Sequence, residues 1–270
     1  MKIFRKKNFD INKRGFASKL TFFTFVLVFM YIPLIILIIY SFNDSKFVSN
    51  WRGFTLKYYV DLFNNEEILE AFYNTMILAV LSTFISTIMG LLSALALENK
   101  KFTGTKLFSS MIYVPLVMPD ILMGVSLALF FYFLKIPTGF ITVLIAHITF
   151  CISYTTIVIQ SRLEGFDYSL EEAAMDLGAN RWQIFAKIKL PIIMPGVIAS
   201  ALLAFTLSID DFIITFFTTG RGFNTLPIYV EGAIRRGTMT TINALSTIMI
   251  GLTILITISA TRFKKILLNN

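Results

Sequence analysis

Long runs of hydrophobic residues dominate this chain. Residues 20–40 contain no Asp, Glu, Lys or Arg, and about 20 apolar residues suffice for a helix to cross a bilayer. Hydrophobic residues make up 56% of the 270 residues and charged residues only 15%, which excludes an ordinary soluble domain. Similar apolar runs cover residues 72–97, 107–134, 140–159, 192–217 and 241–260. The sequence therefore predicts an all-α polytopic membrane protein with six transmembrane helices.

The distribution of basic residues predicts which side of the membrane each loop faces. With the amino terminus inside, cytoplasmic segments hold 17 of the 24 Lys and Arg residues and external segments hold 7. Lys and Arg are enriched on the cytoplasmic side of membrane proteins, so both termini are predicted to be cytoplasmic. This bias also accounts for the net charge of +8 without any role in binding nucleic acid.

The predicted domain organisation is simple. Residues 1–19 form a basic cytoplasmic segment, 20–261 a six-helix transmembrane domain, and 262–270 a cytoplasmic tail. The first apolar run is too long for the core of a signal peptide and lacks a small-residue cleavage site, so we expect it to be retained. The longest cytoplasmic loop, residues 161–191, lies between the fourth and fifth spans.

The second part of this loop, SLEEAAMDLGANRWQIFAKIKLP from Ser169 to Pro191, predicts two short helices. Ser169 and Glu172 have the spacing of a capping box, which predicts the start of the first helix. Gly178 is expected to end it with a positive φ, and Asn180 to cap a second helix that closes at Pro191. An amphipathic connector between two spans would also explain such a segment.

The spacing of the loop residues resembles the EAA loop of binding-protein-dependent ABC importer permeases. That pattern is EAA, three residues, G, nine residues and I-x-L-P. This chain matches every fixed position, with Glu172, Ala173, Ala174, Gly178, Ile188, Leu190 and Pro191. The resemblance implies a MetI-like ABC type I importer permease fold. It also implies that these residues form a coupling helix that docks on a separate ATPase subunit.

Three carboxylates lie within the hydrophobic runs, namely Asp120, Asp210 and Asp211. Each costs roughly 2.5 to 3.5 kcal/mol at the centre of a span, and the predicted spans contain no Lys or Arg to neutralise it. They either line a path for a cationic substrate or serve structurally, by capping a broken helix or by being protonated. Pro115 and Pro119 are expected to bend the third span or to free its carbonyl groups, and Pro195–Gly196 to kink the fifth.

A closer resemblance covers nearly the whole chain. Met118–Ile121, Ser208–Phe212 and Leu226–Pro227 are similar to segments of spermidine/putrescine permeases of the PotC type. The resemblance implies a polyamine substrate, two ATPase subunits, a second permease of the PotB type and an extracytoplasmic polyamine-binding protein of the PotD type. It places Trp51 and Ser208 beside Asp120, Asp210 and Asp211 in the substrate pathway. Trp51 is otherwise explained as an interface aromatic or a packing residue.

One departure from that pattern keeps the substrate open. Glu231-Gly232-Ala233 stands where an aromatic residue, a small residue and methionine are expected. The alternative is therefore an importer permease for another small cation or organic solute.

Several motifs are absent from the sequence. Without G-x-x-x-x-G-K-[ST], ATP and Mg²⁺ are expected to bind the partner ATPase, and this chain is predicted to be non-catalytic. His147, the only histidine, is predicted to be a hydrogen-bonded packing residue, and Cys151 a buried inert thiol. A stand-alone cation channel or ion-coupled carrier would also explain the aspartates but not the loop, and an intramembrane aspartyl enzyme is the remaining alternative.

Overall fold

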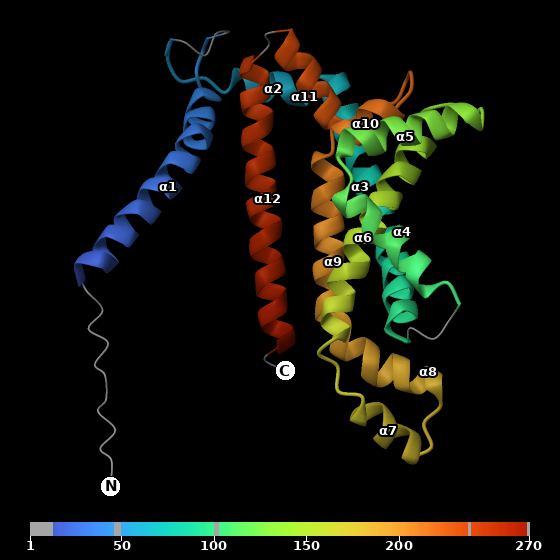
Figure 1. Ribbon diagram of the computed structural model, residues 1–270. Helices are drawn as coiled ribbons and strands as arrows, with labels where there is room; N and C mark the ends of the chain where they lie inside the picture. Colours follow the sequence, from blue (N-terminus) through green and yellow to red (C-terminus); the bar gives the residue numbers. More distant parts are fainter. Residues whose placement is uncertain (1–12, 46–49, 100–102, 237–238, 269–270) are drawn as a thin grey trace. The chain divides into compact units, whose positions relative to one another are not determined.

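The computed structural model of this protein describes residues 13–45, 50–99, 103–236 and 239–268 (Figure 1). Within these ranges every regular element is a helix, and one isolated antiparallel bridge joins Asn43 to Phe54. The predicted all-α class is therefore confirmed. Residues 1–12 of the predicted amino-terminal segment lie outside the described residues.

The chain separates into two compact units. Unit one comprises residues 1–62 and 237–261, and unit two comprises residues 63–236 and 262–270. The helices of unit one are α1 (Lys13–Tyr40), α2 (Lys57–Phe63) and most of α12 (Met239–Leu268). The helices of unit two are α3 (Glu66–Asn99), α4 (Thr105–Val117), α5 (Asp120–Phe133), α6 (Phe140–Leu163), α7 (Ser169–Asp176), α8 (Arg181–Ile184), α9 (Leu190–Asp210), α10 (Ile213–Thr218) and α11 (Leu226–Arg235).

Four helical segments are long and apolar enough to cross a membrane, and a bent pair makes a fifth. The four are Lys19–Tyr40, Glu66–Glu98, Phe140–Leu163 and Arg181–Asp210. Within α12, Thr241–Leu255 is apolar but shorter. A multi-pass membrane protein is thus confirmed, whereas the count of six spans and the cytoplasmic termini stay predictions.

Helix α1 presents its apolar side chains outward. Phe22 and Phe29 are each 70% exposed, and none of its most apolar window is buried inside the protein. Such a surface is stable only against hydrocarbon or another protein, because exposing it to water is unfavourable. This exposure agrees with a retained membrane span.

The core of unit two is formed by α3, α6 and α9, which pack against one another. Small residues bring the first two helices together: a Cβ added at Gly90 of α3 would collide with the Thr155 hydroxyl of α6. The same hydroxyl donates a hydrogen bond to the Ser86 carbonyl of α3 at 2.9 Å. Close approach over glycine and interhelical hydroxyl bonds are typical of helix packing in membranes.

The third predicted span is broken. Helices α4 and α5 meet at 118° across Met118 and Pro119, both of which have extended backbone conformations. Proline has no N–H to continue the helical hydrogen bonds, so the predicted bend is confirmed at Pro119, whereas Pro115 lies inside α4. Residues 107–134 thus form a bent pair of helices, in which α5 turns sharply away from α4.

The fifth predicted span differs in a similar way. Helix α9 includes Pro195 without interruption and ends instead at Asp210. After Asp211 and Phe212 the short helix α10 begins, and it packs against α5 and α6. The two breaks, at Pro119 and at Asp211, fall at the ends of elements that carry the predicted pathway carboxylates.

Candidate functional site

The loop between α6 and α9 forms the predicted helix–turn–helix. Gly178 has φ +83°, and its N–H donates to the Met175 carbonyl at 2.9 Å while the Ala179 N–H donates to the Ala174 carbonyl at 3.0 Å. This pair of bonds is a Schellman motif, which ends a helix most readily when glycine occupies the left-handed position. The predicted role of Gly178 in ending α7 is confirmed.

The predicted capping box at Ser169 is wrong, and the box occurs at the second helix instead. Helix α7 has Tyr168 at its N-cap with no side-chain capping bond, and the Ser169 N–H donates to the Asp167 carboxylate at 3.0 Å. Asn180 and Gln183 exchange two bonds of 2.9 Å, each side chain with the other's N–H. The Asp167 carboxylate thus accepts from the Ser169 N–H that the Glu172 side chain was expected to bind, while the Glu172 N–H donates to the Tyr168 carbonyl at 3.2 Å. The hydrogen bonds from Ser169 lower the pKa of Asp167.

The second helix does not close at Pro191 as predicted. Helix α8 continues through a π-helical turn, Phe185–Lys189, directly into α9. The Leu190 N–H donates to the Phe185 carbonyl five residues earlier, and Pro191, which has no N–H to donate, follows directly after this wider turn. The loop is therefore joined to α9 by continuous helix.

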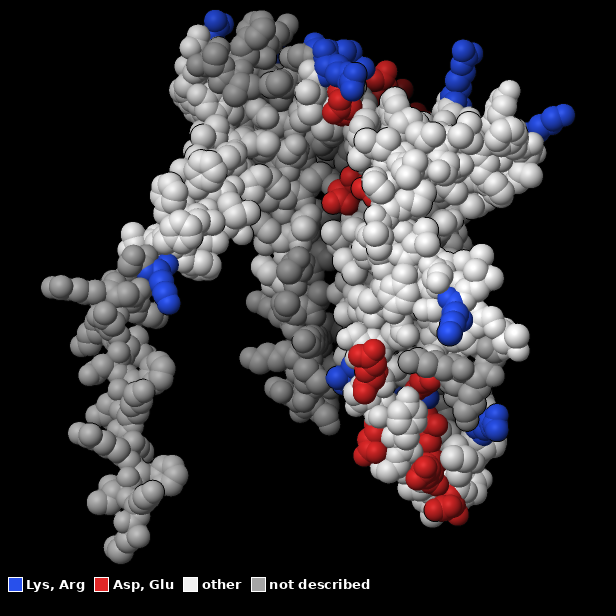
Figure 2. Space-filling model, in the orientation of Figure 1, with Lys and Arg blue, Asp and Glu red and all other residues white. Residues whose placement is uncertain are grey.

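The tip of the loop is exposed. Glu172, Ala173 and Gly178 lie at the surface, and two large apolar side chains are nearly free, Leu177 at 89% and Trp182 at 71% exposed. Acidic side chains gather over this end of unit two, where α7 and α8 lie (Figures 1 and 2). An exposed apolar patch rimmed by charge is typical of a protein interaction surface.

The second half of the motif packs inward instead. Ile188 and Leu190 lie against a buried cluster at this end of the bundle. The cluster consists of Ala94, Ile159, Leu163, Phe166 and Ile193. The predicted coupling residues therefore fall into two groups. Those at the surface are Glu172, Ala173, Gly178 and Pro191. Those that pack inward are Ala174, Ile188 and Leu190.

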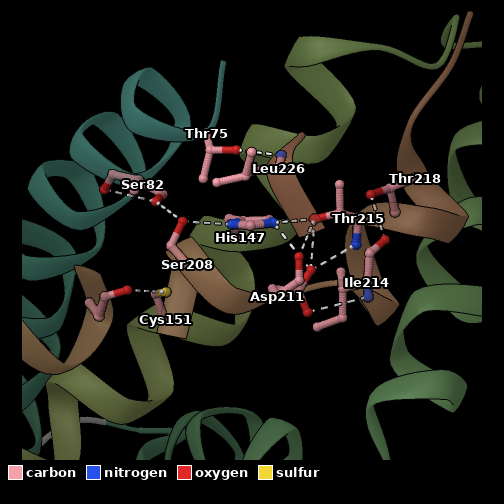
Figure 3. A network of polar contacts seen from close by, with 12 residues as sticks. Thr75, Ser82, His147, Cys151, Ser208, Asp211, Ile214, Thr215, Thr218 and Leu226 are labelled. Carbon is pink, nitrogen blue, oxygen red and sulfur yellow. Dashed lines mark hydrogen bonds and ion pairs between the residues drawn. The ribbon is translucent and has the colours of Figure 1, made fainter. Parts of the chain in front are cut away.

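Asp211 lies in a buried polar network at the break between α9 and α10 (Figure 3). Its carboxylate accepts hydrogen bonds from the Ile214 N–H at 3.3 Å and the Thr215 N–H at 2.8 Å. These N–H groups belong to the first turn of α10 and have no partner within the helix. The alternative that an aspartate caps a broken helix is therefore observed at Asp211.

His147 of α6 connects this carboxylate to the other helices. Its ring is fully buried, with Nε2 at 2.8 Å from the Thr215 hydroxyl and 3.4 Å from Asp211 Oδ2. Its Nδ1 lies 2.7 Å from the Ser208 hydroxyl of α9, which contacts the Ser82 hydroxyl of α3 at 2.9 Å. We call these five residues, Ser82, His147, Ser208, Asp211 and Thr215, the membrane network; the predicted hydrogen bonding of His147 is confirmed.

The donors in the membrane network follow from counting protons. The Thr215 hydroxyl donates its one proton to Asp211 Oδ2 at 2.7 Å, so it accepts from His147 Nε2. If Ser208 donates to Nδ1 the ring is neutral, and if Ser208 donates to Ser82 the ring carries a second proton and a positive charge. Both arrangements satisfy every group, and the second pairs a cation with the Asp211 carboxylate.

The remaining predicted pathway residues have different surroundings. Asp120, in the first turn of α5, and Asp210, the last residue of α9, are both exposed, and within the described residues neither forms an ion pair. Ser208 is buried in the membrane network. Trp51 belongs to unit one, is 51% exposed and contacts the Tyr40 ring edge-on; its place in a substrate pathway stays a prediction.

Sequence reasoning missed the roles of Ser82 and Thr215 and the link between His147 and Asp211. A single histidine in an apolar helix suggests a hydrogen-bonded residue, but the partners lie 61 and more positions away in the chain. The predicted burial of Cys151 is confirmed, and its thiol faces the Ala204 carbonyl of α9 at 3.7 Å.

Comparison with known proteins identifies relatives over most of the chain. The family described as "Binding-protein-dependent transport system inner membrane component" matches residues 86–269. The spermidine/putrescine transport system permease protein PotC of Escherichia coli strain K12 is 41% identical over 239 residues, covering 88% of this chain and 90% of that protein. The putrescine transport system permease protein PotI of the same strain is 42% identical over 230 residues, covering 83% and 82%. PotC of Haemophilus influenzae is 39% identical over 239 residues, covering 88% and 93%.

Solved structures share the fold at low sequence identity. A chain of a bacterial ABC transporter that imports the acidic polysaccharide alginate aligns with a TM-score of 0.73 at 18% identity, covering 94% of this chain and 96% of that one. A chain of the MetNI methionine ABC transporter, in an inward-facing conformation, aligns with a TM-score of 0.60 at 18% identity, covering 75% and 99%. These alignments support the predicted fold class.

Proposed function

This chain belongs to the family of binding-protein-dependent transport system inner membrane components, and we propose that it is the membrane permease subunit of an ATP-driven importer of polyamines. It is a multi-pass protein of the bacterial inner membrane. The observation that carries the substrate assignment is the 41% identity to a spermidine/putrescine permease over 88% of the chain. ATP hydrolysis takes place in a separate subunit.

The loop from Ser169 to Pro191, which we call the coupling loop, supports the assignment of an ATP-driven importer. Its exposed tip, with Glu172, Gly178, Leu177 and Trp182, offers a charged and apolar surface to an ATPase subunit. The same loop passes without a break into α9, whose 21 residues extend over about 30 Å at 1.5 Å each. A displacement of the loop would therefore reach Asp210 at the far end of α9 through a rigid element.

The exposed carboxylates support a cationic substrate. Asp120 and Asp210 stand at the two helix breaks and have no ion-pair partner among the described residues. Unpaired carboxylates in such positions attract an ammonium group and repel anions. Asp211 contributes differently, because its oxygens are engaged by α10 and His147; it holds the break at the end of α9 in shape.

The proposed assembly contains two copies of an ATPase subunit, a second permease of the PotB type and an extracytoplasmic polyamine-binding protein of the PotD type. The binding protein delivers spermidine or putrescine to the outer side. Closure of the ATPase pair then moves the coupling loops, and the two permeases change from outward-open to inward-open around the bound cation.

Reconstitution tests this proposal. The complex, purified with its ATPase, second permease and binding protein, is placed in proteoliposomes, and uptake of radiolabelled spermidine and putrescine is measured with and without ATP. We expect uptake that needs both ATP and the binding protein. Polyamine flux without the ATPase would identify a channel or carrier instead, and uptake of another cation alone would overturn the substrate assignment.

Glu172→Ala tests the coupling surface in the same system. Because Glu172 is exposed on α7, its truncation is expected to leave the permease folded in the membrane and to abolish polyamine uptake. Wild-type uptake by this variant would remove Glu172 from the coupling surface.

A further inference from the structure

Lys189 is a buried cation at the junction between the coupling loop and the bundle. It is the last residue of the π-helical turn that leads into α9, and only 11% of its side chain is exposed. Its ammonium lies 2.8 Å from Glu98 Oε1 and 2.8 Å from Glu171 Oε1. Removing a partner from such a buried group costs more than breaking a surface ion pair, because the remaining charge is left unpaired away from water.

Aromatic side chains from the segment before α7 complete this junction. The Tyr168 hydroxyl donates to the same Glu98 oxygen at 2.8 Å, and this hydrogen bond raises the pKa of Tyr168. The rings of Phe166 and Tyr168 lie 5.2 and 5.5 Å from the Lys189 ammonium, within reach of cation–π attraction. We call Glu98, Tyr168, Glu171 and Lys189 the junction cluster.

The junction cluster joins elements that are distant in the sequence. Glu98 lies at the end of α3, Glu171 lies in the first turn of α7, and Lys189 lies directly before α9. Chain connectivity attaches the coupling loop to α6 and α9, and apolar packing brings its second half against the cluster that includes Ala94 of α3. The bonds of Lys189 and Tyr168 to Glu98 add a polar attachment to α3, and the bond of Lys189 to Glu171 extends this attachment to α7.

We propose that Lys189 is a positioning residue that fastens α7 to α3, so that displacement of the coupling loop moves α3 together with α6 and α9. The inference rests on the proposed function, since it needs an ATPase that moves the loop. These three helices pack as one core, and a loop fastened to all of them shifts the core as a unit. With the fastening lost, α7 moves on its own and the ATPase hydrolyses ATP without moving substrate.

Lysine variants in the reconstituted complex provide the first test, with the ratio of spermidine transported to ATP hydrolysed as the measurement. Lys189→Met is expected to lower this ratio about tenfold while ATP hydrolysis continues. Lys189→Arg keeps a cation that can bind both carboxylates, and we expect a ratio within about twofold of wild type. Lys187→Met is the matched control, because Lys187 is an exposed lysine in the same π-helical turn; it is expected to leave the ratio unchanged.

Glu171→Ala tests the link to α7 without leaving a buried charge alone. Lys189 keeps its bond to Glu98 in this variant, so the protein is expected to fold, and we expect the ratio to fall about fivefold. The double variant Glu171→Ala/Lys189→Met should be no worse than Lys189→Met, because both changes remove the same link. A ratio in the double variant that equals the product of the two single effects would contradict a shared role of Glu171 and Lys189.

The outcomes separate this inference from the proposed function. A wild-type complex that fails to import polyamines overturns the proposed function. A wild-type complex that imports them, combined with an unchanged ratio in Glu171→Ala, overturns the role of the junction cluster alone. Should Lys189→Met fail to assemble with the ATPase, Glu171→Ala decides the question.

Discussion

The junction cluster and the membrane network both bury carboxylates in unit two, but they hold them in different ways. In the junction cluster a long side chain, Lys189, reaches two glutamates on separate helices. In the membrane network Asp211 is held by backbone N–H groups of α10 and by the ring of His147. The junction cluster therefore fastens one helix to another through side chains, whereas the membrane network fixes the geometry of a helix break through backbone N–H groups.

Within the membrane network region, two adjacent aspartates differ in exposure. Asp210 adjoins Asp211 in sequence, yet Asp210 is exposed while Asp211 is engaged on both oxygens. Successive residues at the end of a helix point in different directions. The helix break thus gives adjacent aspartates different surroundings, one at the surface of unit two and one bonded within it.

The largest effect on stability is expected from His147→Leu, which removes the imidazole from the membrane network. Removing the imidazole takes a hydrogen-bond partner from the buried Ser208 and Thr215 hydroxyls and a neighbour from the Asp211 carboxylate, at a cost of about 1 to 3 kcal/mol for each group left unsatisfied. His147→Gln can still bond Ser208 and Thr215, so it serves as the matched control and should cost less. Thermal unfolding of the purified complex measures both, and equal melting temperatures for wild type and His147→Leu would contradict the importance of the network.

A smaller effect on stability is expected for Asp211→Asn, and none for Asp210→Asn. Asp211→Asn weakens the bonds to the Thr215 N–H and hydroxyl and should destabilise the protein by about 1 to 3 kcal/mol. Asp210→Asn changes an exposed group and should leave the melting temperature unchanged while lowering polyamine uptake. Measuring melting and uptake on both variants tests whether the two aspartates have different roles. A loss of stability in Asp210→Asn would show that the two residues act alike.

Gly178 tests whether the coupling loop depends on backbone conformation or on its surface. A β-branched residue is poorly tolerated at φ +83°, so Gly178→Val should cost about 1 to 2 kcal/mol and distort the end of α7. Gly178→Asn tolerates this conformation and meets no atom within 4 Å of its Cβ, so the fold should persist. ATP-dependent uptake that is normal in Gly178→Asn and lost in Gly178→Val assigns the role to conformation; loss in both assigns it to contact with the ATPase.

The smallest effect is expected from Asn180→Ala. This change removes one half of the capping box with Gln183 and should cost about 1 kcal/mol in the local stability of α8. Hydrogen exchange of the amides of residues 181–184 measures the fraying. Because α8 continues into α9, exchange deep in α9 should stay unchanged, and an increase there would contradict local fraying.

The sequence predicted those features that depend on local chemistry. Gly178 ends α7 and Asn180 caps α8 because each acts on backbone groups within four positions. Pro119 breaks its span because it lacks an N–H. The error at Ser169 has a similarly local cause. The Ser169 N–H, which the Glu172 side chain was predicted to bind, donates instead to Asp167, two residues earlier.

The contacts of Asp211 and Lys189 could not be predicted from the chain alone. The partner of Lys189 at Glu98 is far away in sequence, and so is the link from His147 to Ser208. Hydrophobic periodicity indicates which runs are helical but not how two helices are rotated against each other. That rotation decides whether a polar side chain meets a partner, water or lipid.

By itself the sequence determined a helical membrane protein, the break at Pro119 and the spacing of its coupling loop. These properties follow from hydrophobic length and from backbone hydrogen bonding, which act over a few residues. The tertiary structure alone decided that Asp211 is held by His147 while Asp210 stays exposed, and that Lys189 joins α7 to α3. Such pairings depend on the packing of distant helices, because the electrostatic attraction of these groups becomes strong only at contact distance and away from water.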